Sequence, residues 1–160
     1  ILDGGLAAWE RAGYQIVGGP GNLGRGQAQE VVAGQLPVAT IDEVKNFDGV
    51  LIDTREANRY AGRKERLDLK AGHIPGAVSV PTREILNPDN TFRPAEEIRA
   101  TFEKVGVTDP NNVIVYSGSG VHSAQAIAAM HHAGLPGAAL YLGGWSQWCA
   151  DRNNPVERSD

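Results

Sequence analysis

Short apolar runs alternate with helix-like segments through most of this chain, and that alternation narrows its possible folds more than any other feature. Four runs have the length and apolar content of buried strands: GVLIDTR, GAVSVP, NVIVY (112–116) and AALYL. Two segments between them have the apolar spacing or length of helices, PAEEIRATFEKVG (94–106) and VHSAQAIAAMHHAG. The alternation predicts an α/β domain with a central, mostly parallel sheet flanked by helices.

The carboxyl ends of parallel strands meet at one edge of such a sheet, and working residues gather there. This places the segment Asp53–Arg59 near the segment Ser117–His122. The second segment lies in the glycine-broken loop SGSGVHS, between a strand and a helix. Backbone N–H groups at a helix start attract negative charge.

We therefore predict that the loop cradles an anion, with Ser117 at the position expected of a nucleophile. The residues of the cradle are Gly118, Ser119, Gly120, Val121 and His122. An ordinary glycine turn remains the alternative. A serine-hydrolase elbow is excluded because Ser119 lacks glycines two residues away on both sides, and a P-loop is excluded because the loop has no lysine.

The segment 53–81 is locally rich in arginine. Arg59 is the best candidate for a contact with an anionic ligand, since a guanidinium suits oxyanions. Asp53 and Arg55 are expected to form a structural pair beside the strand. In a helical turn Arg55 and Arg59 would share a face, with Arg59 pointing toward the Ser117 loop.

Other charged and titratable residues are expected to have structural or surface positions. His73, before the turn of GHIPGA, is interpreted as structural. Solvated surface positions are expected for Arg63, Lys64, Arg66, His131 and His132.

Two segments resemble each other across the chain. ILDGGLAAW (1–9) and LYLGGWSQW (140–148) align on a Gly-Gly pair with a tryptophan at the same spacing. This suggests that residues 1–17 are the tail of a preceding repeat, unless the likeness is chance. A glycine-rich linker over 18–36 and one domain over 37–158 would follow, with Thr40 and Glu43 forming a capping box at the first helix.

The composition argues against several functions and structural features. A net charge of −4 argues against nucleic-acid binding, and no apolar run reaches the roughly 18 residues of a membrane span. The single cysteine, Cys149, excludes an internal disulfide and a multi-cysteine zinc site, and is expected to be a small buried residue. No signal peptide is visible, so a cytoplasmic location is the expectation.

With these motifs in order, the chain resembles the rhodanese family of sulfurtransferases over roughly 37–158. The resemblance rests on DTREANRY, AGHIPGAVSVP, VIVYSGSGV and LYLGGWSQW with NPVE. It is strongest to the tandem-domain thiosulfate and 3-mercaptopyruvate sulfurtransferases. The resemblance implies a five-stranded parallel sheet, no cofactor, and a loop whose first residue is a cysteine that carries sulfane sulfur as a persulfide.

By this resemblance the partners are a small anionic sulfur donor, a thiophilic acceptor such as cyanide, and an upstream rhodanese repeat. Arg59 matches an arginine that helps to bind the donor. The Gly-Ser-Gly-Val core is similar to the mercaptopyruvate type, although such loops usually carry threonine where His122 stands.

Ser117 departs from the family because it stands where the cysteine is expected. A hydroxyl ionises far less readily than a thiol, whose pKa is about 8.5, so it cannot form a persulfide. Either a Cys→Ser change was introduced into an active domain, or the repeat is naturally degenerate. A non-catalytic module that binds an anion or protein is the alternative function. A phosphatase of related fold would need a Cys-x5-Arg loop, which this chain lacks.

Overall fold

The computed structural model describes residues 2–21, 26, 32 and 34–159. Within these residues, five strands form one sheet in the order β1-β5-β4-β2-β3, and every neighbouring pair is parallel. The strands are β1 (Val38–Ala39), β2 (Val50–Asp53), β3 (Val78–Ser79), β4 (Val113–Tyr116) and β5 (Ala139–Tyr141). The α/β fold with a parallel sheet is therefore confirmed.

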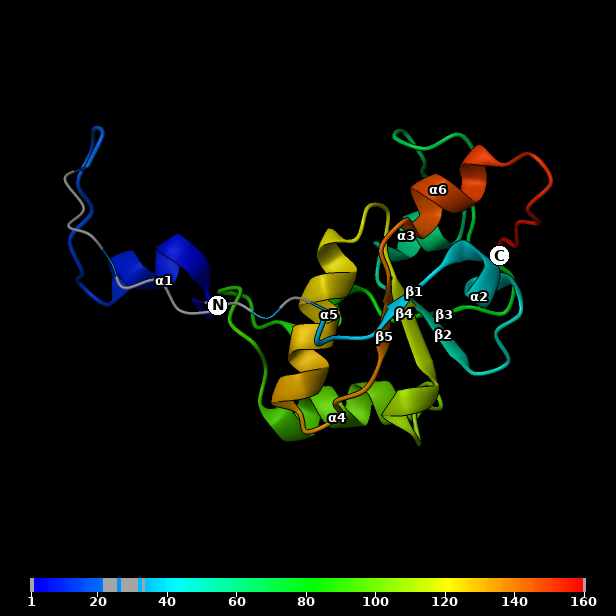
Figure 1. The fold of residues 1–160 in the computed structure, drawn as a ribbon. Helices are drawn as coiled ribbons and strands as arrows, with labels where there is room; N and C mark the ends of the chain where they lie inside the picture. The colour runs from blue at the N-terminus through cyan, green and yellow to red at the C-terminus, as the bar shows by residue number, and fades with distance from the viewer. Residues whose placement is uncertain (1, 22–25, 27–31, 33, 160) are drawn as a thin grey trace.

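Helices cover both faces of the sheet. The helices of the described residues are α1 (Gly5–Arg11), which lies away from the sheet, and α2 (Ile41–Lys45), α3 (Ala57–Tyr60), α4 (Ala95–Lys104), α5 (Val121–His132) and α6 (Gly144–Ala150), with short 3-10 turns at Thr82–Ile85 and Pro110–Asn112. Figure 1 shows α4 and α5 on one side of the sheet and α2 and α6 on the other. In the described part of the chain, no helix has the length and apolar character needed to cross a bilayer.

The two layers follow from the two-residue period of a strand, which points successive side chains to opposite faces. In β4, Val113 and Val115 join the apolar cluster under α4 and α5, whereas Ile114 and Tyr116 join the cluster under α2 and α6. Both clusters are built from buried side chains, so the central strands are apolar on both faces, as expected of a parallel sheet.

Local signals set several boundaries. The capping box at α2 is confirmed, since the Thr40 side chain accepts from the amide of Glu43 while the Glu43 carboxylate accepts from the amide of Thr40. The sequence patterns did not indicate β1, which is only two residues long and pairs with β5 at the sheet edge. The prediction that Arg55 and Arg59 share a helical face is wrong, because α3 begins only at Ala57 and Arg55 lies before it.

The first helix, α1, stands apart from the layered domain in Figure 1 and buries none of its residues. Two polar contacts connect this segment to the loop before α4. Arg11 pairs with Asp89 at 3.2 Å, and the amide of Phe92 donates to Asp3 Oδ1 at 2.9 Å. Much of the segment 18–36, which the sequence predicts to be a linker, lies outside the described residues; its described members are exposed.

Candidate active site

The central strands bring the two predicted segments to one edge of the sheet. β2 and β4 are parallel neighbours, with Asp53 opposite Tyr116. The amide of Thr54 donates to the carbonyl of Tyr116 at 3.0 Å, so the pairing continues to the last residue before the loop. The expectation that 53–59 and 117–122 share an edge is therefore confirmed.

Ser117, the first residue of the loop, is buried, with 1 % of its surface exposed. Its Oγ accepts from the amide of Gly120 at 3.1 Å and lies 3.1 Å from Oγ of Ser123. Ser123 in turn donates to the carbonyl of Gly120 at 3.0 Å. Because Ser123 uses its hydrogen there, Ser117 donates to Ser123, and the two hydroxyls and the Gly120 backbone form a closed ring of hydrogen bonds.

The backbone around this ring is open to an anion. The amides of Gly118, Ser119, Val121 and His122 donate no hydrogen bond to another described residue. They lie in the turn that enters α5, where the helix dipole adds about half a positive charge. Gly120 makes this turn with φ +87°, in the left-handed region that favours glycine. Four amides at a helix start, unpaired within the described chain, are what an anion cradle requires, and the cradle itself stays a prediction.

The outer side of the loop rests on the start of α6. The amide of Trp145 donates to the carbonyl of Ser117 at 2.8 Å, and the amide of Ser146 donates to that of Gly118 at 3.1 Å. Gly144 permits this approach, since it has φ +55° and a Cβ there would lie 2.6 Å from the Gly118 oxygen. The Gly-Gly-Trp motif therefore has a physical role, which is to orient the loop's carbonyls away from the cradle.

Asp53 and Arg55 form the expected pair beneath the site. Arg55 donates from Nη2 to Asp53 Oδ2 and to the carbonyl of Gly72, both at 2.6 Å, and both charged side chains are buried. The guanidinium also lies 4.7 Å from the ring centroid of Trp145. Burial by itself lowers the pKa of Arg55, but the hydrogen bond and the charge of Asp53 outweigh it, so the pKa is raised. Arg55 therefore remains protonated.

Arg59 lies beside the loop, as predicted. Its Nη1 is 3.6 Å from the position that a Cβ on Gly118 would occupy. Its other guanidinium nitrogens contact two carboxylates, with Nη2 at 3.0 Å from Glu65 Oε2 and 2.7 Å from Asp68 Oδ2. The sequence indicates Glu65 and Asp68 only as charges that offset the local arginines, because the composition of the loop between α3 and β3 does not predict its fold.

The remaining candidates occupy the environments expected of them. His73 is buried, stacks on Tyr60 at a centroid distance of 3.7 Å, and donates from Nδ1 to the Tyr60 carbonyl at 2.8 Å. Its backbone pairs with Glu157 in both directions. These contacts fasten the C-terminal segment to the domain. Exposed side chains are found at Arg63, Lys64, Arg66, His131 and His132, and Cys149 is buried.

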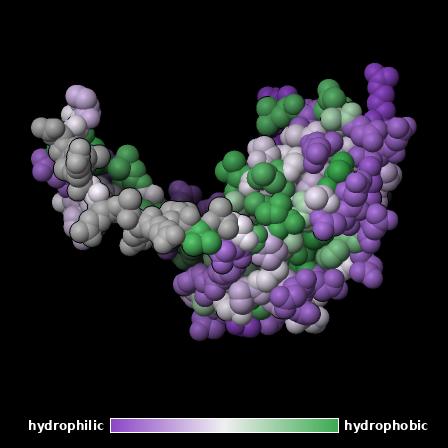
Figure 2. Space-filling view, in the orientation of Figure 1, coloured by the Kyte–Doolittle hydropathy of each residue, from purple (hydrophilic) through white to green (hydrophobic). Residues whose placement is uncertain are grey.

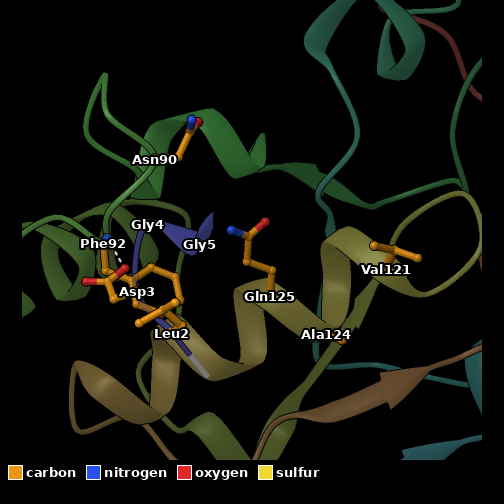
Figure 3. A pocket seen from close by; sticks show the side chains of 9 residues that line it. All are labelled: Leu2, Asp3, Gly4, Gly5, Asn90, Phe92, Val121, Ala124 and Gln125. Atoms are coloured by element: carbon orange, nitrogen blue, oxygen red, sulfur yellow. Dashed lines mark hydrogen bonds between the residues drawn. The ribbon is translucent and has the colours of Figure 1, made fainter. Parts of the chain in front are cut away.

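A pocket of about 510 Å³ lies next to the loop, between the start of α1 and the first turns of α5. Figure 3 shows Val121, Ala124 and Gln125 of α5 on one side and Leu2–Gly5 on another. Val121 belongs both to the cradle and to this pocket, so a ligand held by the loop would have the pocket as a neighbour. Sequence patterns gave no signal for it, since its walls come from three separate segments.

Comparison with known proteins places this geometry in a family. The sequence model of the Rhodanese-like domain matches residues 38–151. The chain is 35% identical to a probable 3-mercaptopyruvate sulfurtransferase of Pseudomonas aeruginosa, covering 100% of this chain and 58% of that protein. It is 37% identical to a putative thiosulfate sulfurtransferase of Mycobacterium tuberculosis, covering 99% and 57%. The chain thus spans little more than half the length of these relatives.

A solved structure supports the fold independently. The anaerobic ergothioneine biosynthesis enzyme of Chlorobium limicola, in complex with its natural substrate trimethyl histidine, superposes with a TM-score of 0.84. The two are 26% identical, and the match covers 100% of this chain and 41% of that one.

Proposed function

This chain belongs to the rhodanese-like domain family, and we propose that it is the sulfur-transfer domain of a tandem sulfurtransferase, with Ser117 at the nucleophile's position. The donor would be thiosulfate or 3-mercaptopyruvate, and the acceptor cyanide or another thiophile. One observation carries the proposal. The amides of Gly118, Ser119, Val121 and His122, which follow the first residue of the loop into α5, donate to no other described residue, and Arg59 Nη1 lies beside Gly118.

A cysteine at this position would complete the chemistry. Its thiolate attacks the outer sulfur of the donor, the bond from that sulfur to the rest of the donor breaks, and sulfite or pyruvate leaves. For 3-mercaptopyruvate, the donor's thiol proton ends on the carbon that becomes the methyl group of pyruvate. Cyanide then attacks the outer sulfur of the persulfide, and the S–S bond breaks to restore the thiolate. The loop amides stabilise the anionic states.

The hydroxyl of Ser117 does not perform the first step, since oxygen is neither ionised at neutral pH nor a good partner for sulfane sulfur. The buried ring of Ser117, Ser123 and Gly120 gives specific support to the second candidate function, a non-catalytic module. In that case the loop binds an anion, or a partner's anionic group, without turning it over.

The experiment that tests catalytic ancestry is Ser117→Cys. With thiosulfate or 3-mercaptopyruvate it is expected to gain one sulfur atom, seen by mass spectrometry, and to release thiocyanate when cyanide is added. Ser119→Cys is the matched control, because it places an exposed cysteine two positions later in the same loop. The unchanged chain controls for Cys149. A folded Ser117→Cys protein that takes up no sulfur would favour the binding module.

An upstream repeat of the same chain belongs to this proposal, with 1–17 as its tail, 18–36 as the linker and 37–158 as the present domain. Gly5 and Gly144 each begin a seven-residue helix, at φ +62° and +55°. Trp9 and Trp148, equally spaced after these glycines, both donate from the indole to a backbone carbonyl further along the chain. Gly5 has nothing within 4 Å of its Cβ position, whereas Gly144 meets the loop.

The surface beside the loop is suited to being covered by such a repeat. Val121 and Leu142 are 71% and 59% exposed, and Leu142 touches the Cβ position of Gly120. Figure 2 shows hydrophobic residues gathered over α5 on this face. Large exposed apolar side chains that lie together are typical of a surface that another domain or protein covers.

A further inference from the structure

Two carboxylates hold the side chain of Arg59 in one orientation. Nε and Nη2 both donate to Glu65, at 3.2 Å and 3.0 Å to Oε2, and Nη2 also donates to Asp68 at 2.7 Å. The side chains of Glu65 and Asp68 are 5% and 9% exposed. Because both acceptors are shielded from water, these contacts are screened less by salt than surface ion pairs are.

Glu65 is itself fixed by the loop that carries it. Its Oε1 accepts from the amides of Arg66, Leu67 and Asp68 at 2.9, 2.9 and 3.2 Å. Burial by itself raises the pKa of Glu65, but the amides of Leu67 and Asp68, together with Arg59, outweigh it and lower the pKa. Glu65 therefore stays charged, and Arg59 cannot turn without breaking several hydrogen bonds.

One nitrogen of Arg59 is left for a ligand. Nη1 donates to no other described residue, and it is the guanidinium nitrogen that lies 3.6 Å from the Cβ position of Gly118. Gly118 has no side chain to stand between them. Nη2 lies 4.0 Å from the same position, but it already donates to Glu65 and Asp68. An anion that rests on the loop amides can therefore take a hydrogen bond from Nη1 without displacing a carboxylate, whereas a two-point contact that includes Nη2 would displace one.

The charge around this nitrogen is already offset. Three carboxylates (Asp53, Glu65 and Asp68) pair with two guanidinium groups (Arg55 and Arg59) in one connected cluster. Lys64 and Arg66 line the outer pocket beside Arg59, but both are exposed and solvated. A ligand with one negative charge uses the attraction of Nη1, whereas a second charge on the ligand adds repulsion from Asp68 and Glu65.

We propose that Glu65 and Asp68 are specificity-determining residues, which present one nitrogen of Arg59 to the loop and offset its charge, so that the site prefers a singly charged donor. The donor class is then an α-keto carboxylate bearing a thiol, in preference to the dianion thiosulfate. This inference rests on the proposed function and adds to it the charge of the donor.

The test compares two probes, pyruvate with one negative charge and sulfate with two. Each is titrated at low ionic strength into the isotope-labelled chain, and the amide signals of 118–122 report binding by NMR. Asp68→Asn removes one negative charge and keeps an acceptor for Arg59. The matched control is Asp48→Asn, which makes the same change at an exposed position just before β2, at the opposite edge of the sheet.

Electrostatic energy is proportional to the charge of the ligand. The fold increase in sulfate affinity that Asp68→Asn produces should therefore be the square of the fold increase in pyruvate affinity. If pyruvate binds about threefold more tightly, sulfate should bind about tenfold more tightly. Asp48→Asn is expected to change either affinity by less than about twofold. Asp68→Ser removes the same charge with a smaller side chain. It should give the same squared relation between the two increases in affinity, and it replaces Asp68→Asn if asparagine disturbs folding.

The inference would be overturned if Asp68→Asn raised the affinity for pyruvate and for sulfate by the same factor, or if Asp48→Asn raised them as much. Either result would leave the proposed function standing. If neither probe shifts the loop amides of the unchanged chain, the proposed function fails, and the inference fails with it. A purely structural role for Asp68 would alter both affinities alike, so the ratio separates selectivity from folding.

Discussion

Gly144→Ala tests whether the contact between α6 and the loop shapes the site. Gly144 has φ +55°, and placing an alanine in the left-handed region costs about 1–2 kcal/mol. The added methyl would also lie 2.6 Å from the carbonyl oxygen of Gly118, so the helix and the loop must separate.

Separation weakens two hydrogen bonds, those from Trp145 and Ser146 to the loop carbonyls, at 2.8 and 3.1 Å. Each contributes about 1 kcal/mol net. The free energy of unfolding should therefore fall by about 3–4 kcal/mol in total, and sulfate binding at the loop amides should weaken with it.

The assay is urea unfolding followed by tryptophan fluorescence, with Gly76→Ala as the control. Gly76 also has a positive φ, +79°, but nothing lies within 4 Å of its Cβ position. That variant should lose only the backbone cost, about 1–2 kcal/mol. Equal losses in the two variants would show that the approach of α6 to the loop carbonyls contributes nothing, and the account of the Gly-Gly-Trp motif would be refuted.

Three further variants probe the buried polar groups. Ser123→Ala should lower the free energy of unfolding by about 1–3 kcal/mol, because it breaks the ring under the loop, whereas the exposed Ser119→Ala should change it by less than about 0.5 kcal/mol. Asp53→Asn should cost about 3–5 kcal/mol in urea unfolding, because it removes the closest carboxylate from the buried charge of Arg55; a loss below about 1 kcal/mol would contradict this. The pKa of Glu65 is lowered in the fold, so its contribution is complete above the ordinary carboxyl pKa of about 4.3 and is lost as pH falls through the lower, folded value. Glu65→Gln should therefore flatten the dependence of stability on pH below about 4.3, measured by unfolding across that range, and an unchanged slope would argue against the assigned contacts.

The sequence by itself determined the layers of this domain and the edge at which its site lies. Apolar strands such as VIVY are buried on both faces, which is typical of a parallel sheet between helices, and the turn residues beside them indicate where strands end and loops begin. A loop with two glycines at the start of α5 follows from the same pattern, as does the pairing of Asp53 with Arg55, which are two residues apart. These features depend on short-range periodicity and on adjacent residues.

Only the tertiary structure decided what surrounds Ser117 and Arg59. The contact of Gly144 with the carbonyls of the loop joins residues far apart in the chain, and a glycine there is one of 20 in the sequence. Likewise, Glu65 and Asp68 are two acids in a charged loop until its backbone turns them onto Arg59. Such contacts depend on distances between elements, which residue order does not encode locally, and they determine how much charge the site presents to a ligand.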